Sequence, residues 1–120
     1  MKLKNILITV SNLEKSISFY KELFGLHEVS KNDGNVILTE GLVLQDAQLW
    51  RQSFGKEIIS HNNASLLYFE ERDMDLFLEK LNAFEPAVSI ATPLTELPWG
   101  AKLMRIYDLD GNLIEIQCPM

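Results

Sequence analysis

The 120-residue chain has a formal net charge of −6, and 47% of its residues are hydrophobic. This much apolar sequence predicts one compact domain, residues 1–120, with a substantial core. The acidic charge disfavours nucleic acid as a partner, because phosphate binding needs clustered Lys and Arg. No apolar run is long enough to cross a bilayer, and the first ten residues do not resemble a signal peptide. We therefore expect a cytoplasmic protein that does not associate with membranes.

The first half of the chain predicts one strand, one helix and three shorter strands. Residues 3–10 are an apolar strand rich in Ile and Val. The S-x-x-E pattern that follows is typical of a capping box, so a helix should begin at Ser11 or Asn12. Gly25 stands where a left-handed cap would end that helix. We expect strands at 28–31, 36–38 and 42–44, and a loop or linker over the polar residues 52–63.

The second half predicts the same order of elements. It contains a strand at 66–69, a helix at 74–82 with Asp73 as its N-cap, and strands at 88–91, 102–107 and 112–117. Shifting the first helix by 61 positions aligns its apolar stripe with that of the second helix. The chain therefore predicts β-α-β-β-β written twice, with module one at about 1–52 and module two at about 64–120. Such a sheet has one face free of helix, and two such faces can form a shared cup for a ligand.

Two stretches resemble a known family. NILITVSNLEKSISFYKELFGL and YDLDGNLIEI are similar to the opening and closing signatures of the vicinal oxygen chelate superfamily, although Leu109 replaces the usual proline. That superfamily includes glyoxalase I, bleomycin-resistance proteins and extradiol dioxygenases. The resemblance implies an α+β fold, in which two tandem βαβββ modules form a curved, cup-shaped mixed sheet with helices on its outer face. It also implies a homodimer and, in the enzymes, a divalent metal such as Zn, Ni, Mn or Fe.

The metal-ligand positions implied by the resemblance are mostly altered. Only Glu115, on the last strand, matches the pattern, while Asn5 replaces the first His and Leu66 the second. The fourth strand offers Leu44 or Gln45. One carboxylate and one or two amides make a poor site for metals that favour imidazole and several carboxylates. We therefore expect no cofactor, and we keep a divalent metal as the less favoured alternative.

The residues that should face the cup follow from strand alternation. Arg105 is equally consistent with a structural salt bridge to Glu115, and each Trp with a dimer contact or with packing at the rim. No catalytic residue is identified. The residues expected to bind a ligand are Asn5, Gln45, Trp50, Tyr68, Trp99, Arg105 and Glu115.

The leading hypothesis is a homodimeric, small-molecule-binding protein of the glyoxalase/bleomycin-resistance type without a complete metal site. Glu115 would act as an acceptor or counter-charge, and Asn5 and Tyr68 as hydrogen-bonding groups. The alternative is a metal-dependent, glyoxalase I-like lyase or a dioxygenase, in which Glu115, Gln45 and a histidine from a loop or the partner chain hold the metal. A second alternative is a catalytically inert dimeric domain. The sequence leaves open whether the protein is an enzyme, and it does not name the ligand.

Overall fold

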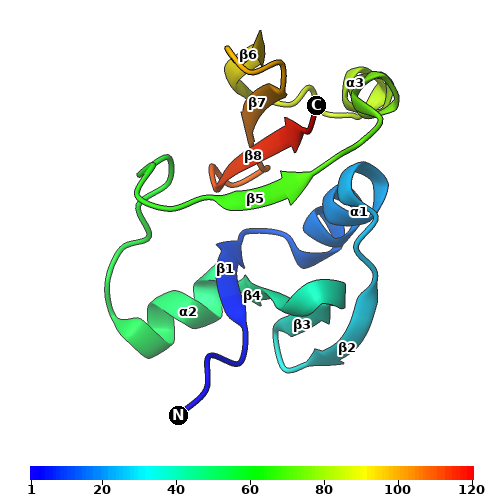
Figure 1. The fold of residues 1–120 in the computed structure, drawn as a ribbon. Helices are drawn as coiled ribbons and strands as arrows, with labels where there is room; N and C mark the ends of the chain where they lie inside the picture. Colours follow the sequence, from blue (N-terminus) through cyan, green and yellow to red (C-terminus); the bar gives the residue numbers. More distant parts are fainter. The chain divides into compact units, whose positions relative to one another are not determined.

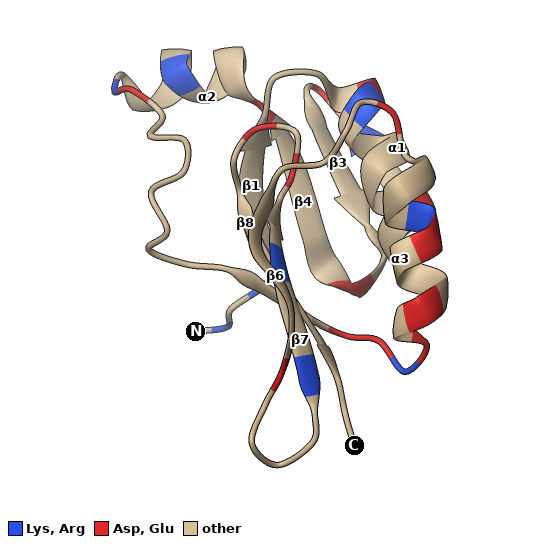
Figure 2. Ribbon diagram, turned by 90° about the horizontal axis from the view of Figure 1, so that it is seen from above, with Lys and Arg blue, Asp and Glu red and all other residues tan.

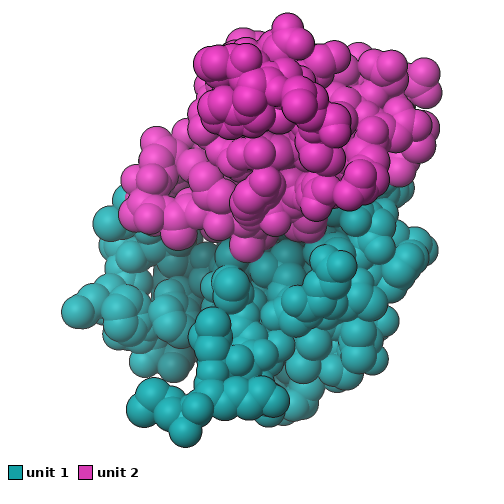
Figure 3. All heavy atoms as spheres, viewed as in Figure 1, with its two compact units in different colours: residues 1–59 teal, residues 60–120 magenta.

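Two compact units, Met1–Ile59 and Ser60–Met120, make up the computed structural model, which describes all of residues 1–120 (Figures 1 and 3). Unit 1 contains β1 (Ile6–Val10), α1 (Leu13–Phe24), β2 (Glu28–Asn32), β3 (Asn35–Leu38), a 3-10 turn (Thr39–Gly41), β4 (Leu42–Asp46) and α2 (Ala47–Phe54). Unit 2 contains β5 (Leu67–Glu70), α3 (Met74–Ala83), β6 (Ile90–Glu96), β7 (Lys102–Tyr107) and β8 (Leu113–Cys118).

Both units have the same sheet topology. The strand orders are β1-β4-β3-β2 and β5-β8-β7-β6. In each sheet the first strand pairs in parallel with the last strand of its module, and the remaining pairs are antiparallel. Each unit is thus a four-stranded mixed sheet with the order β-α-β-β-β. The predicted α+β class and the two βαβββ modules are confirmed.

Side-chain caps start the two long helices at equivalent positions. The Oδ1 of Asn12 accepts a hydrogen bond from the Lys15 N–H at 3.0 Å, so Asn12 is the N-cap of α1. Asp73 caps α3 in the same way, accepting from the Leu76 N–H at 3.0 Å. Gly25 ends α1 with a φ of 68°, in the left-handed conformation predicted for it. The helices begin at residues 13 and 74, which is the 61-residue offset seen in the sequence.

Three elements differ from the sequence-based expectation. The first strand begins at Ile6 and not at residue 3. The predicted loop at 52–63 is wrong for its first residues, because α2 continues to Phe54. Asp46 is a plausible N-cap and Gly55 a plausible end for this helix, but the helix has only eight residues and half of them are polar. The sixth strand lies at 90–96 and not at 88–91. It is an edge strand with two register irregularities and contains Pro93, so neither alternation nor β-propensity marks it clearly.

One face of each sheet is the more deeply buried. Alternate strand residues are at most 1% exposed in both units, namely Val10, Val36, Leu38 and Leu44 in unit 1 and Ile106, Ile114 and Ile116 in unit 2. The long helix of each unit lies to one side of its own strands (Figures 1 and 2). Charged residues gather on the helices and connecting loops, and the strands carry few (Figure 2). None of the helices combines the length and the apolar character that a membrane crossing requires.

Candidate functional site

In unit 1 the strand register places an apolar row beside an amide row on the same face of the sheet. Leu7 of β1 and Ile37 of β3 both lie opposite Val43 of β4. Two residues further along β4, Gln45 lies opposite Asn35. Because side chains two residues apart on a strand share a face, the apolar and amide rows point the same way.

These two rows line a pocket. Its volume is about 450 Å³, within the range of small-molecule sites. The apolar row forms its wall, and side-chain amides and one ammonium supply the polar groups; carboxylates are absent from the lining. The full lining is Lys4, Asn5, Leu7, Asn32, Asn35, Ile37, Val43 and Gln45.

Two of the pocket amides have defined hydrogen-bonding states. The Asn5 Nδ2 donates to the carbonyl oxygen of Gly41 at 3.1 Å, which fixes the orientation of that amide. The Asn35 Oδ1 is buried and has no hydrogen-bond partner. A buried acceptor without a donor carries a desolvation penalty of about 1–3 kcal/mol, which a donor supplied from outside would relieve. The lining residue Asn35 therefore has an unused acceptor that is itself buried and not exposed to the pocket.

In unit 2 the corresponding register brings together a polar row. Tyr68 of β5 and Arg105 of β7 lie on either side of Glu115 of β8, and Thr92 of β6 lies beyond Arg105. The row therefore crosses all four strands of the sheet. Tyr68 is 61% exposed, whereas Glu115 is only 8% exposed. A buried carboxylate thus sits at the centre of this row.

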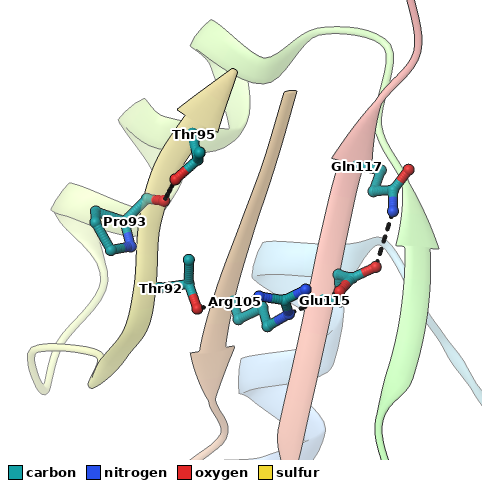
Figure 4. Close-up of polar contacts among 6 residues, drawn as sticks. All are labelled: Thr92, Pro93, Thr95, Arg105, Glu115 and Gln117. Carbon is teal, nitrogen blue, oxygen red and sulfur yellow. Dashed lines mark hydrogen bonds and ion pairs between the residues drawn. The ribbon is translucent and has the colours of Figure 1, made fainter. Parts of the chain in front are cut away.

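The Glu115 carboxylate is held at both oxygens (Figure 4). Its Oε1 accepts from the Arg105 Nε at 2.7 Å, and its Oε2 accepts from the Gln117 Nε2 at 2.9 Å. The Arg105 Nη1 also donates to the Thr92 Oγ1 at 3.3 Å. The charge of the carboxylate is therefore balanced by a side chain from the neighbouring strand, and the salt bridge considered from sequence is present.

The two tryptophans occupy different surroundings from the strand edges expected of them. Trp50 lies in α2, where its ring stacks on that of Phe54 with centroids 5.1 Å apart. Trp99 lies in the turn between β6 and β7 and is 64% exposed. Neither lines the unit 1 pocket. Their predicted contact with a ligand stays a prediction.

Comparison with known proteins identifies the family. A family model described as the glyoxalase-like domain matches residues 3–120. The chain belongs to this family. Its glyoxalase-like fold is shared with solved structures of the glyoxalase/bleomycin resistance/dioxygenase group, as the resemblance of the two signature stretches implied. No curated protein matches the chain.

Several solved structures resemble this glyoxalase-like domain along nearly its whole length. A protein of unknown function from Agrobacterium tumefaciens is 26% identical, with 100% of this chain and 95% of that chain covered and a TM-score of 0.77. A glyoxalase-related enzyme from Fulvimarina pelagi is 25% identical, with 95% of this chain and 86% of that chain covered and a TM-score of 0.74. A lactoylglutathione lyase from A. tumefaciens shares the fold, with a TM-score of 0.68. It is 23% identical, and the match covers 97% of this chain and 92% of that chain.

The residues at the family's metal-ligand positions do not fit a transition metal. The 61-residue offset relates Tyr68 to Leu7, and Leu7 lies opposite Val43. The residue in unit 1 that corresponds to Glu115 is therefore Val43, and the expectation of Leu44 or Gln45 was wrong because it lacked the strand register. Val43 and Leu66 offer no donor atom. The chain contains no group of three or more His, Cys, Asp or Glu side chains that could hold a metal ion. Both Glu115 oxygens already accept hydrogen bonds from N–H groups. These positions therefore lack the imidazoles and free carboxylates that such a metal requires as ligands.

Sequence reasoning missed several residues of these two faces. The side-chain amides of Asn32 and Asn35 belong to the unit 1 pocket, and Asn35 could have been found from its alternation with Ile37. Gln117 alternates with Glu115 and bonds to it, so it was also within reach of sequence reasoning. Thr92 was not, because its strand was expected to end at residue 91.

Proposed function

We propose that this protein binds a small organic molecule in the unit 1 pocket without using a bound metal. The observation that supports this most directly is the composition of that pocket, an apolar wall edged by four side-chain amides. Small-molecule sites commonly combine a mainly apolar lining with a few polar groups that orient the ligand. The volume of about 450 Å³ suits a ligand the size of one or two rings.

The polar groups of the pocket indicate what the ligand should offer. Gln45, in the register position opposite Asn35, has both an amide donor and an acceptor to offer. A planar molecule with an amide-like edge would match the Gln45 amide, while its apolar body lies on Leu7, Ile37 and Val43.

The state of Glu115 supports binding without a metal. In a metal-dependent member of the family this carboxylate would be a ligand, but here its two oxygens accept from Arg105 and Gln117. Metal binding would have to displace a guanidinium at 2.7 Å and bring a second cation close to it. We therefore prefer a binding protein to a metal-dependent lyase or dioxygenase.

Protein NMR with small planar amides tests the proposal. Benzamide and nicotinamide, titrated into the ¹⁵N-labelled protein, should shift the resonances of the pocket residues. Leu7→Trp should abolish these shifts, because Leu7 lines the pocket and an indole would fill it. Leu76→Trp is the matched control, since Leu7 and Leu76 are 43% and 45% exposed and Leu76 lies outside the pocket. No shift with either amide, or shifts that survive in Leu7→Trp, would contradict the proposal.

We also propose that the protein is a homodimer, as the family resemblance implies. Light scattering during size-exclusion chromatography tests this directly. A mass near twice the 13.7 kDa of the chain is expected, and a mass of one chain at micromolar concentration would overturn the assignment.

A further inference from the structure

We propose that Arg105 anchors the carboxylate group of a small organic acid on the sheet of unit 2. This site lies within unit 2, so the inference goes beyond the function proposed for the unit 1 pocket. It follows from how the guanidinium is held, which of its donors remain unused and what lies beside it in the sheet.

The guanidinium is fixed in place from two sides. Glu115, whose side chain is 11% exposed, accepts from the Nε, and Thr92 accepts from the Nη1. Gln117 in turn fixes the carboxylate by donating to its other oxygen at 2.9 Å. Arg105 is thereby linked to neighbours on both adjacent strands, β8 and β6 (Figure 4). An arginine held in this way loses less conformational entropy when it binds a ligand.

Most of the donors of this guanidinium are unused. Arginine has five N–H donors, and Arg105 uses one at Nε and one at Nη1, so three remain, including both at Nη2. The Arg105 side chain as a whole is 36% exposed. The fork of an arginine matches the two oxygens of a carboxylate, and such charge-assisted bonds are about twice as strong as neutral ones.

The negative charge of Glu115 makes this site selective for planar carboxylates over other anions. Because Glu115 already balances the charge of Arg105, an anion gains little from simple Coulomb attraction and must gain from directional hydrogen bonds. Chloride, which is spherical, cannot use the fork in this way. Tyr68 lies in the same row, 61% exposed, and its hydroxyl makes no hydrogen bond within the chain, so an aromatic surface and a further donor lie nearby.

Benzoate and benzamide are the probes that test the inference, because they are nearly the same shape and differ in charge. The readout is the ¹⁵N–¹H signal of the Arg105 Nε together with the backbone signals of β7 and β8, in 100 mM chloride. Benzoate should shift these signals and benzamide should leave them unchanged. Arg105→Lys keeps the positive charge beside Glu115 but lacks the fork, and it should weaken benzoate binding at least tenfold. Arg72→Lys is the control, because Arg72 also pairs with a glutamate in unit 2 but is 82% exposed; it should bind benzoate as the wild type does.

The outcomes separate the inference from the proposed function. If benzoate and benzamide both shift only the unit 1 pocket, the small-molecule function stands and the role of Arg105 is overturned. If benzoate binds equally well to Arg105→Lys, or if chloride abolishes its binding at equal concentration, the directional carboxylate site is likewise overturned. If neither probe shifts any signal, both the function and the inference fail.

Discussion

The Nε of Arg105 donates to the Oε1 of Glu115 at 2.7 Å, and the two residues lie directly opposite each other on β7 and β8. Glu115 is the one residue that matches the metal-ligand pattern implied by the family resemblance. Its carboxylate therefore forms a salt bridge within its own sheet. The Arg105 guanidinium therefore balances the charge of this carboxylate from within the chain. A buried carboxylate needs such compensation, and the metal-ligand positions that the family resemblance implies hold Asn5, Val43 and Leu66.

Loss of the cation from this pair should destabilise the protein. Arg105→Met leaves Glu115 buried with only Gln117 as a donor, and we expect a loss of about 1–3 kcal/mol in the free energy of unfolding, because removal of one partner leaves the other without full compensation. The expected loss stays at this level because the Arg105 side chain is 36% exposed and water screens the pair. Urea unfolding followed by circular dichroism measures it.

The double variant Arg105→Met/Glu115→Leu is the control for that prediction. With both charges removed, much of the lost stability should return, giving a coupling energy of roughly 1–3 kcal/mol between the two sites. Additive effects of the two single changes would show that the pair does not act as a unit.

The turn before β8 should tolerate no side chain at its glycine. Gly111 has a φ of 84°, and an added Cβ would meet the Ser60 Oγ and lie 2.7 Å from the His61 Nδ1. Gly25 has a similar φ of 68°, but nothing lies within 4 Å of an added Cβ. Gly25→Ala should therefore cost about 1–2 kcal/mol from backbone conformation alone, and Gly111→Ala clearly more. Thermal unfolding measures both variants. An equal loss of stability in the two would mean that the clash of the added Cβ at position 111 with Ser60 and His61 costs nothing.

The two helix caps should contribute equally if the modules are true repeats. Asn12 and Asp73 each accept a hydrogen bond from the backbone N–H three residues later, at 3.0 Å. Asn12→Ala and Asp73→Ala should each lower the free energy of unfolding by about 0.5–2 kcal/mol. Asn12→Ser and Asp73→Ser should keep most of the stability that the alanine variants lose, because Ser is also a good N-cap residue. An Asn12→Ala variant as stable as the wild type would contradict the assignment of Asn12 as the cap.

Much of the fold could be predicted because its signals are local. Strand alternation in β1 and β8, the helix caps and the glycine ends each depend on a few adjacent residues. The offset of 61 residues between the helices was also visible. The helix α2 was missed because it has only eight residues, half of them polar, and the edge strand β6 was misplaced because Pro93 and two register irregularities interrupt it.

The candidate site could be predicted only in part, since it depends on which strands pair and in what register. Glu115 was identifiable from its motif, and its salt bridge with Arg105 was one of two alternatives open from sequence. The correspondence of Val43 with Glu115, and the row from Tyr68 to Thr92, require the strand pairings themselves. A register shift of one residue would have sent each of these side chains to the opposite face.

Metal content and metal titration test the central claim, that this glyoxalase-like domain acts without a metal at Glu115. Protein purified without chelator should contain far less than one equivalent of Zn, Ni, Mn or Fe by elemental analysis. Calorimetric titration with Zn²⁺ and Ni²⁺ should give the same weak response for the wild type and Glu115→Ala, because the Glu115 oxygens are bonded to Arg105 and Gln117. One equivalent of metal in the wild type that is lost in Glu115→Ala would contradict the account.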